Sequence, residues 1–287
     1  MSSHAPELAQ PPTPRSRPRL PFSPRHLLLL PLALVMVTPL AWMLMTSIQT
    51  PDEARHFPPV LPSGIHWQNY TDALTAAPFG HFFVNSVIVT AVVVVGNLIL
   101  CSLAGYGFAR FDFFGRDLVF LLVLATLMVP FQVVMIPTFL LMRELGLIDR
   151  LPSLILPNLA SGFGIFLMRQ FFRTLPVELE EAARIDGCSR IATLFRVVLP
   201  LSGPALATLA VITFLYTWND FLWPLVAIQS ESKMTLPLGL SSFQGAHQTS
   251  WTLLMAGNVM AVLPMLVAFL LAQKQFVRSI ASAGVKG

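Results

Sequence analysis

The chain has 287 residues, of which 55% are hydrophobic and only 11% are charged. Soluble domains carry about 25% charged residues, so this composition excludes an ordinary soluble domain and favours a membrane protein. The net charge of +4 does not indicate a nucleic-acid partner, because the basic residues are spread over short segments and form no patch.

The first 26 residues predict a disordered tail. They hold seven prolines and four arginines and few apolar side chains, so they cannot bury a core. The apolar run that follows, Leu27–Ile48, is longer than the 7–15 apolar residues of a secretory signal. No clear cleavage site follows it, and it therefore predicts an uncleaved first membrane span.

Six apolar runs are long enough to cross a bilayer, since about 20 helical residues span the hydrocarbon core. They predict an all-α integral membrane protein whose six transmembrane helices occupy residues 27–272. The predicted spans are 27–48, 83–104, 118–141, 151–172, 204–227 and 253–272. Several contain proline, which transmembrane helices tolerate because their neighbours satisfy the freed carbonyl groups. Residues 273–287 are predicted to form a C-terminal tail.

The basic residues predict the orientation of these spans. Of the 18 Lys and Arg residues, 14 lie in the tails and loops on one side of the predicted membrane. Loops on the cytoplasmic side carry such an excess, so both termini and the loop 173–203 are predicted to be cytoplasmic. The two cysteines, Cys101 and Cys188, lie in an apolar run and a polar segment, and predict neither a disulfide nor a metal site.

The loop between spans four and five predicts a short polar helix. Pro176 suits a first helical turn, three glutamates follow where the helix dipole favours anions, and Gly187 suits the end of the helix. Glu180 and Arg184 are four residues apart in the order that favours an ion pair. Such a helix is typical of a rigid docking element. An interfacial helix lying on anionic lipid is the alternative, and the acidic first half disfavours it.

Two further features of this loop support docking. A narrow stripe of Leu179, Ala182 and Ala183 would let a partner surface approach closely. Ser189 is predicted to cap a second short helix, which ends before span five. Its expected apolar face has helical spacing and consists of Ile191, Leu194, Phe195 and Val198.

The same loop carries a specific spacing pattern. Glu181-Ala182-Ala183 is followed after three residues by Gly187, and nine residues later by Val197, Val198 and Leu199-Pro200. This pattern resembles the cytoplasmic signature loop of permease subunits in binding-protein-dependent ABC importers. Further segments resemble the second permease of the carbohydrate-type, maltose-transporter-like group: 50–53, 67–70, 106–110, 128–130, 166–172, 218–225 and 284–287. The resemblance covers roughly residues 27–287.

The resemblance implies a set of partners and roles. The partners would be a homologous second permease, two cytoplasmic ATPase subunits and an extracytoplasmic solute-binding protein in the bacterial cytoplasmic membrane. A sugar is the implied solute, with glycerol-phosphate-type polyols as the alternative. The residues that would couple the chain to the ATPase are Glu178, Glu181, Ala182, Ala183, Arg184, Asp186, Gly187, Leu199 and Pro200.

The motif search favours an external energy source. The sequence contains no G-x-x-x-x-G-K-[ST] phosphate loop and no recognised hydrolase or metalloprotease motif. We therefore expect a non-catalytic subunit without a cofactor or metal of its own, whose partner ATPase binds ATP and magnesium. A membrane enzyme or an assembly scaffold is disfavoured.

Polar residues inside the predicted spans are candidates for the solute path. Asp220 is the only acidic residue in an apolar run, and an intramembrane carboxylate indicates a functional site. Hydrogen bonds between helices, or a position at the membrane interface, are the alternative explanations. The candidate pathway residues are Asn97, Gln132, Asn158, Asn219, Asp220 and Asn258. A self-sufficient channel or secondary transporter would need intramembrane charges on several helices, and only Asp220 qualifies.

Overall fold

The computed structural model describes residues 25–245 and 249–283, and in that part of the chain helices form the whole framework. Of the predicted N-terminal tail, residues 1–24 lie outside the described residues, as do residues 284–287. The chain divides into two units, residues 1–42 and 43–287. Helix α1 (Arg25–Ser47) contains the boundary and begins two residues before the predicted span.

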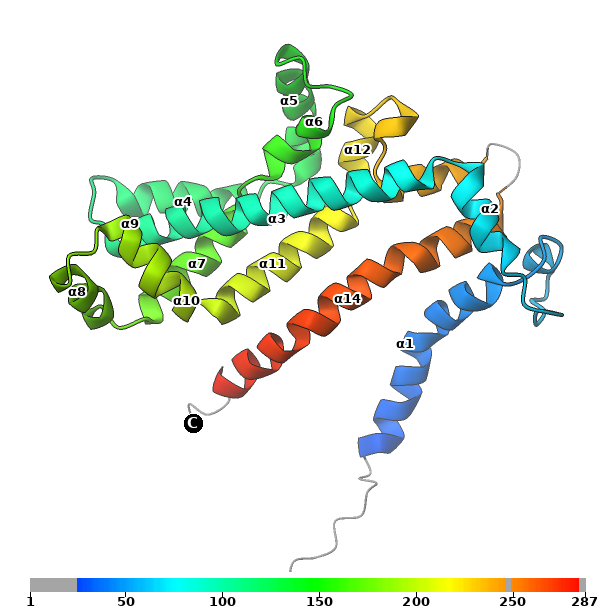
Figure 1. Ribbon diagram of the computed structural model, residues 1–287, viewed down its shortest axis with the longest axis horizontal. Helices are drawn as coiled ribbons and strands as arrows, with labels where there is room; N and C mark the ends of the chain where they lie inside the picture. The colour runs from blue at the N-terminus through cyan, green and yellow to red at the C-terminus, as the bar shows by residue number, and fades with distance from the viewer. Residues whose placement is uncertain (1–24, 246–248, 284–287) are drawn as a thin grey trace, which may run out of the picture. The chain divides into compact units, whose positions relative to one another are not determined.

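The second unit contains helices α2 to α14, and the longer ones follow the predicted spans in order (Figure 1). Their bounds are α2 Gln68–Ala76, α3 Phe79–Arg110, α4 Arg116–Thr126, α5 Phe131–Glu144, α6 Leu151–Ile155, α7 Gly162–Thr174, α8 Glu178–Ile185, α9 Arg190–Thr193, α10 Leu199–Leu201, α11 Gly203–Trp218, α12 Leu222–Ala227, α13 Leu236–Leu240 and α14 Trp251–Ala283. The 3-10 turns are η1 Glu53–Arg55, η2 Leu156–Asn158, η4 Glu231–Lys233 and η5 Ser241–Phe243, and η3 (Leu194–Val198) is a π-helix. Helix α14 extends beyond the predicted sixth span through Ala283.

Among the residues that the structure describes, three helical segments are long and apolar enough to cross a membrane as single helices: His26–Ser47, Phe79–Arg110 and Trp251–Leu271. Three further pairs pass the same test only together, because each is bent at a short break. The bends are 100° between α4 and α5, 41° between Leu151–Asn158 and α7, and 83° between Arg190–Leu201 and α11. The structure therefore contains three such segments, or up to six if each bent pair is one span, and the count of six stays a prediction.

Three predicted spans are not continuous helices, and one of them, the run 151–172, divides into α6, η2 and α7. The run 118–141 breaks between Thr126 and Phe131, where Pro130 lacks an N–H and restricts the residue before it. The run 204–227 breaks after Trp218, and the carboxylate of Asp220 accepts a hydrogen bond from the backbone N–H of Trp223 at the start of α12. The apolar composition of a run predicts that it can cross a membrane, but it does not fix the direction of the chain within the run.

Helix α3 forms the central element of the second unit and packs most extensively against α7 and α11 (Figure 1). Gly105 allows the close approach to α7: a Cβ atom at this position would lie 2.8 Å from Cβ of Met168 and 2.9 Å from the backbone N of Arg169. A larger residue would push the two helices apart. The contact therefore depends on a glycine, as expected for tightly packed transmembrane helices.

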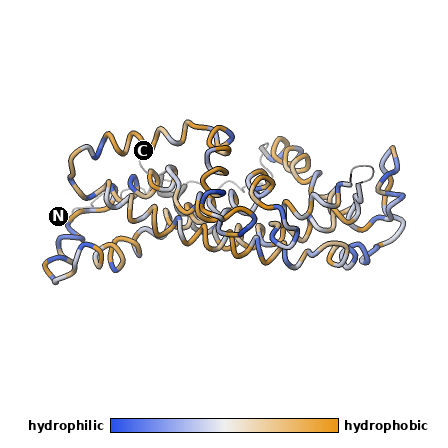
Figure 2. Tube along the Cα trace, turned by 90° about the horizontal axis from the view of Figure 1, so that it is seen from above, coloured by the Kyte–Doolittle hydropathy of each residue, from blue (hydrophilic) through white to orange (hydrophobic). Residues whose placement is uncertain are grey.

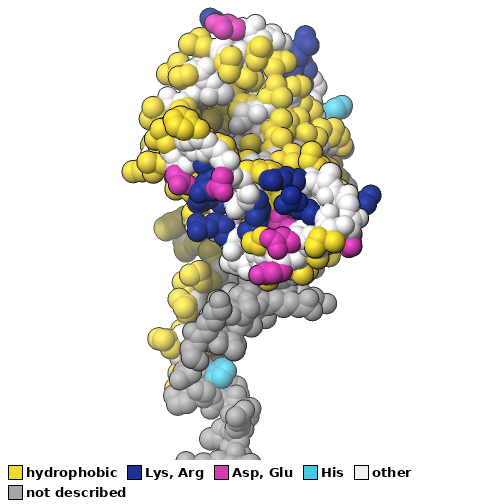
Figure 3. Space-filling view, turned by 90° about the vertical axis from the view of Figure 1, so that its left-hand side faces the viewer, with side chains coloured by type: hydrophobic (Ala, Val, Ile, Leu, Met, Phe, Trp, Pro, Cys, Tyr) yellow, Lys and Arg dark blue, Asp and Glu magenta, His cyan; other side chains and the backbone are white. Residues whose placement is uncertain are grey.

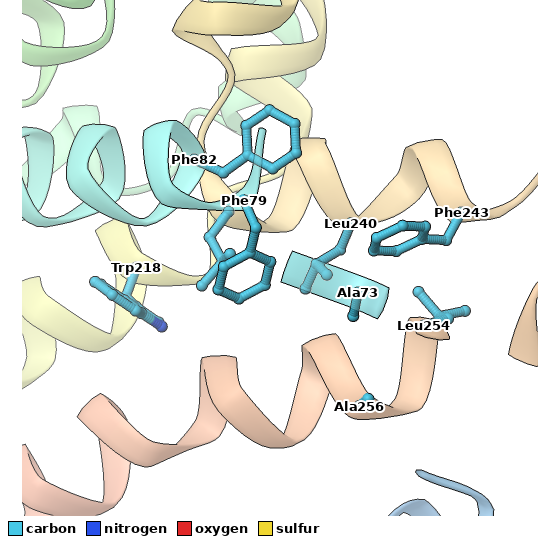
Figure 4. Close-up of a cluster of buried hydrophobic side chains, with 9 residues drawn as sticks. Ala73, Phe79, Phe82, Trp218, Leu240, Phe243, Leu254 and Ala256 are labelled. Carbon is cyan, nitrogen blue, oxygen red and sulfur yellow. The ribbon is translucent and has the colours of Figure 1, made fainter. Parts of the chain in front are cut away.

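Buried hydrophobic clusters follow α3 along its length. At the Phe79 end, Phe79 and Phe82 lie among side chains from α2, α11, α13 and α14 (Figure 4). Val89 and Val93 belong to a second cluster, and Cys101 and Tyr106 to a third. Hydrophobic residues run along the helices, while hydrophilic residues gather mainly in the connections and at the helix ends (Figure 2). Large exposed apolar side chains on α4, α5 and α14 are the arrangement that a lipid environment requires.

Candidate functional site

The polar loop after α7 folds as two short helices with the predicted local signals. Helix α8 (Glu178–Ile185) is followed by Gly187 with φ +86°, a left-handed conformation that favours glycine. Ser189 then caps α9, because its side chain accepts a hydrogen bond from the backbone N–H of Ala192 at 3.2 Å. The predicted stop at Gly187 and the predicted cap at Ser189 are both confirmed.

Glu180 is the inward-facing carboxylate of α8. Its Oε1 lies 2.6 Å from Nε of Arg110, and its Oε2 accepts a hydrogen bond from the hydroxyl of Tyr106 at 2.8 Å. Arg110 also donates to the backbone carbonyl of Leu175, at 2.9 Å, just before α8 begins. The predicted Glu180–Arg184 pair is wrong, because Glu180 is buried against α3 and Arg184 is exposed.

The remaining predicted coupling residues divide between the two faces of this loop. Ala183 is buried and Leu199 is half-buried. The exposed members are Glu178, Glu181, Ala182, Arg184, Asp186, Gly187 and Pro200. The predicted stripe is therefore split, since Ala183 packs inward while Leu179 and Ala182 face outward.

Two of the four residues predicted to share one apolar face of the second short helix are exposed. Leu194 and Val198 are 1% exposed, as their spacing indicates, but Ile191 is 67% exposed and Phe195 is 48% exposed. Residues 194–198 form a π-helix, whose wider turn changes which side chains share a face, and Thr193 is buried instead. The expected apolar face was therefore wrong at Ile191 and Phe195.

We call the exposed residues of the segment 178–198, which comprises α8, the turn after it, α9 and η3, the α8–η3 surface. It combines exposed apolar side chains with carboxylates and arginines. Its apolar members include Leu179, Ile185, Ile191 and Phe195, and its charged members include Glu178, Glu181, Arg184 and Asp186. Figure 3 faces this end of the molecule and shows acidic and basic side chains gathered around hydrophobic ones. Such a mixture is typical of a surface that docks a protein partner.

Two cavities lie along one side of α11 and collect most of the predicted pathway residues. A cavity of about 690 Å³ is lined by Gln132, Asn219 and Asp220 together with aromatic residues. A second cavity of about 300 Å³ is lined by Asn97 and Asn158. Ile212 and Tyr216 line both cavities. Five of the six candidates are thus brought to one region, while Asn258 lies on α14 and lines neither of these cavities.

The amides in these cavities also make structural bonds. Asn97 is buried, and its Nδ2 donates to the backbone carbonyl of Asn158 at 2.6 Å while its Oδ1 accepts from the hydroxyl of Ser161 at 2.9 Å. Asn219 donates to the carbonyl of Leu215 at 2.8 Å. These bonds join α3 to the break before α7 and stabilise the end of α11, which supports the structural explanation for both asparagines.

Sequence reasoning missed several polar residues of the same cavities. Thr213, Tyr216 and Thr217 line the cavities beside the predicted residues. The signal was present, because the helical spacing of residues 213, 216 and 217 places them on one face of α11. Among the described residues that line the two cavities there is no Lys or Arg. In the part of the chain that the structure describes, no group of three metal-ligating side chains comes together.

Most of the chain is similar to known transport permeases. The family model described as "Binding-protein-dependent transport system inner membrane component" matches residues 101–282. An arabinooligosaccharides transport system permease of Halalkalibacterium halodurans is 40% identical over 227 residues, which cover 79% of this chain and 81% of that protein. An sn-glycerol-3-phosphate transport system permease of Pectobacterium atrosepticum is 37% identical over 264 residues, covering 89% of this chain and 94% of that one.

Two solved structures share the fold. A chain of a bacterial ABC transporter involved in the import of the acidic polysaccharide alginate superposes with a TM-score of 0.77 at 28% identity, covering 87% of this chain and 94% of that one. A chain from a bacterial alginate ABC transporter, in complex with its alginate pentasaccharide-bound periplasmic protein, gives a TM-score of 0.64 at 18% identity, covering 86% and 93%. At that identity the second likeness shows the fold alone.

Proposed function

The chain belongs to the family of binding-protein-dependent transport system inner membrane components, and from that premise we propose that it forms half of the path for a sugar and is moved by a partner ATPase. It is a permease of the sugar ABC importer type, as its relatives indicate. Subunits of this family are not themselves catalytic. ATP and magnesium would therefore be bound by the partner, and this chain would hold neither.

The proposed docking site of the ATPase is the α8–η3 surface. It presents exposed apolar side chains, Ile185 among them, beside charges of both signs. On the opposite, buried side of α8, the Glu180–Arg110 ion pair attaches this helix to α3. A docking element must be rigid to transmit a displacement, and α8 meets that requirement.

The proposal includes the partner subunits of the chain and its orientation in the membrane. The chain would pair with a homologous second permease and two cytoplasmic ATPase subunits, and it would receive solute from an extracytoplasmic binding protein. Loop 173–203 and both termini would face the cytoplasm of a bacterial cell, because the basic residues concentrate in those segments. The η4–α13 segment would then lie on the outer side.

The two cavities on α11 are the proposed solute path. Amide and hydroxyl groups suit the hydroxyl groups of a sugar, and the ring of Tyr216 offers an apolar face to the sugar ring. The absence of Lys and Arg among their described lining residues favours a neutral saccharide over a glycerol-phosphate-type solute. The glycerol-3-phosphate relative keeps the second class as the alternative.

The test compares two variants of the α8–η3 surface in the reconstituted importer. Glu181→Lys reverses an exposed charge, and Gly187→Val places a branched residue at φ +86°. Both are expected to weaken co-purification with the ATPase and to uncouple hydrolysis from uptake, while membrane insertion is kept. Glu144→Lys is the matched control, an exposed charge reversal on α5. Normal co-purification and normal uptake in both variants would refute the proposal.

A further inference from the structure

Both ends of α3 are tied to distant segments by buried side chains. At the Arg110 end, Arg110 and Tyr106 hold Glu180 of α8. The side chains of Arg110 and Glu180 are only 12% and 9% exposed. Because an ion pair shielded from water is weakly screened and costly to break, α8 cannot rotate against α3 without leaving a buried charge unpaired.

At the other end, α3 holds the η4–α13 segment. Asn85 donates through Nδ2 to the backbone carbonyls of Ser232 at 2.9 Å and Met234 at 3.0 Å. The hydroxyl oxygen of Ser86 accepts a hydrogen bond from the backbone N–H of Leu236 at 2.7 Å. Both side chains are buried, so these bonds fix the segment to the helix.

Between these two attachments α3 is a continuous helix. It has 32 residues and therefore spans about 48 Å. Of the three helices that are long enough to span a membrane singly, α1 and α14 contain proline inside the helix, whereas α3 has none. The other candidate spans are bent at a break. Helix α3 is thus the straight connection between the α8–η3 surface and the η4–α13 segment.

We propose that α3 transmits movement between the two sides of the importer as a rigid body, with Glu180 as the positioning residue that fixes α8 to it. A displacement of α8 by the ATPase would move the η4–α13 segment, and binding of a partner at that segment would act back on α8. The proposal rests on the proposed function, because it takes α8 as the ATPase contact. Reciprocity between two coupled sites is a thermodynamic requirement.

The first experiment measures whether the two ends move together. Spin labels are attached to native Cys188, which follows α8, and to Cys in the variant Glu231→Cys on the exposed η4 turn. Cys101 is fully buried and is left in place. In the reconstituted importer the distance between the labels is expected to be the same with and without ATP and magnesium. In Glu180→Ala it is expected to become nucleotide-dependent.

The second experiment measures coupling. The stimulation of ATP hydrolysis by the solute-loaded binding protein is expected to fall about tenfold in Glu180→Ala and in Arg110→Ala, and the double variant should lose little more. Glu180→Gln keeps one acceptor oxygen and the shape of the side chain but replaces the other oxygen with an amide donor, and it should retain part of the stimulation. Arg116→Ala removes an arginine at the same end of the molecule whose ion-pair partners are exposed, and it should behave like the wild type.

The outcomes separate this inference from the proposed function. A wild-type chain that neither recruits an ATPase nor shows stimulated hydrolysis would refute the proposed function itself. A wild-type importer that couples normally, with Glu180→Ala coupling equally well, would overturn only the role of Glu180. A label distance that changes with ATP in the otherwise unaltered chain would overturn the rigid transmission by α3.

Discussion

Glu180 of α8 and Arg110 of α3 are 70 residues apart in the sequence, and their Oε1 and Nε atoms lie 2.6 Å apart. Tyr106 adds a hydroxyl donor to the same carboxylate. The pair makes α8 part of the helical framework, although the loop that carries it is polar. A short helix of eight residues would be marginal by itself, and this attachment supplies the tertiary contact that such a helix needs.

Removing Glu180 is expected to destabilise the fold, because it leaves the largely shielded Arg110 guanidinium without its carboxylate partner. Glu180→Ala should cost about 3–5 kcal/mol of unfolding free energy, and Tyr106→Phe, which removes one hydrogen bond, about 1 kcal/mol. Unfolding of the detergent-solubilised chain measures both. The exposed carboxylate of Glu144 provides the control, since Glu144→Ala should stay within about 0.5 kcal/mol of the wild type. Equal stabilities of the Glu180 and Glu144 variants would contradict the prediction.

A single methyl group added at Gly105 is expected to destabilise the contact between α3 and α7. The added Cβ would lie 2.8 Å from Cβ of Met168, so Gly105→Ala should cost about 1–3 kcal/mol. Two residues further along α3, a Cβ at Gly107 meets nothing nearer than the Phe111 ring at 4.0 Å. Gly107→Ala should therefore leave the midpoint of thermal unfolding unchanged or raise it. A Gly105 variant as stable as the Gly107 variant would disprove the close packing.

The hydrogen bonds that Glu53 accepts from Ser63 and Thr50 are expected to weaken at low pH. Hydrogen bonds from Ser63 and Thr50 lower the pKa of Glu53 from 4.5 to about 2. The stabilisation is fully present above about pH 4.5 and is lost as the pH falls toward 2, because protonation removes the acceptor charge. Hydrogen exchange of the amides of Ser63 and Thr50, compared at each pH with the variant Glu53→Gln, measures the effect. The difference in amide protection between the wild type and Glu53→Gln should disappear in acid. A difference that stays constant with pH would contradict the prediction.

Asp149 is expected to hold the segment after α12 in place. It accepts hydrogen bonds from the backbone N–H groups of Gln229 at 3.0 Å and Ser230 at 2.8 Å and from the Ser230 hydroxyl, and these contacts hold the pKa of its carboxyl well below the usual range. Asp149→Asn tolerates the observed φ of +59° but removes the charge. Amide exchange at Gln229 and Ser230 should speed up about tenfold. Asp72→Asn, exposed on α2, should leave the exchange unchanged.

Asp220 is expected to affect transport more than assembly. Asp220→Asn keeps an oxygen to accept the N–H of Trp223 but removes the charge beside Gln132 and Tyr216 in the larger cavity. Uptake of sugar by the reconstituted importer should change several-fold, or about 1 kcal/mol in the transport barrier, while the yield of the assembled complex stays constant. Asn258→Ala, outside both cavities, should leave uptake as it is. Unchanged uptake in Asp220→Asn would assign Asp220 a purely structural role.

The local features of the α8–η3 surface were predictable because they depend on neighbours in the sequence. Gly187 adopts the left-handed conformation that a helix end requires, and Ser189 bonds to an amide three residues ahead. The expectation that this loop docks a partner came from its resemblance to the permease signature loop, carried by Glu181, Gly187 and Leu199-Pro200, and it stays a proposal. What the sequence pattern missed was the partner of Glu180, since Arg184 and Arg110 are both arginines and only one lies on the buried side.

The amino-acid sequence by itself determined that this chain is helical, belongs in a membrane and carries a polar loop with a short helix. Those properties follow from composition, apolar run length and spacing, each of which acts over a few helical turns. Tertiary structure alone decided which polar residues share the cavities on α11 and that Glu180 binds Arg110. These depend on contacts between residues 60 to 150 positions apart, as in the Asn97–Ser161 and Ser86–Leu236 bonds, and no local pattern encodes which of several chemically equivalent partners the packing brings within reach.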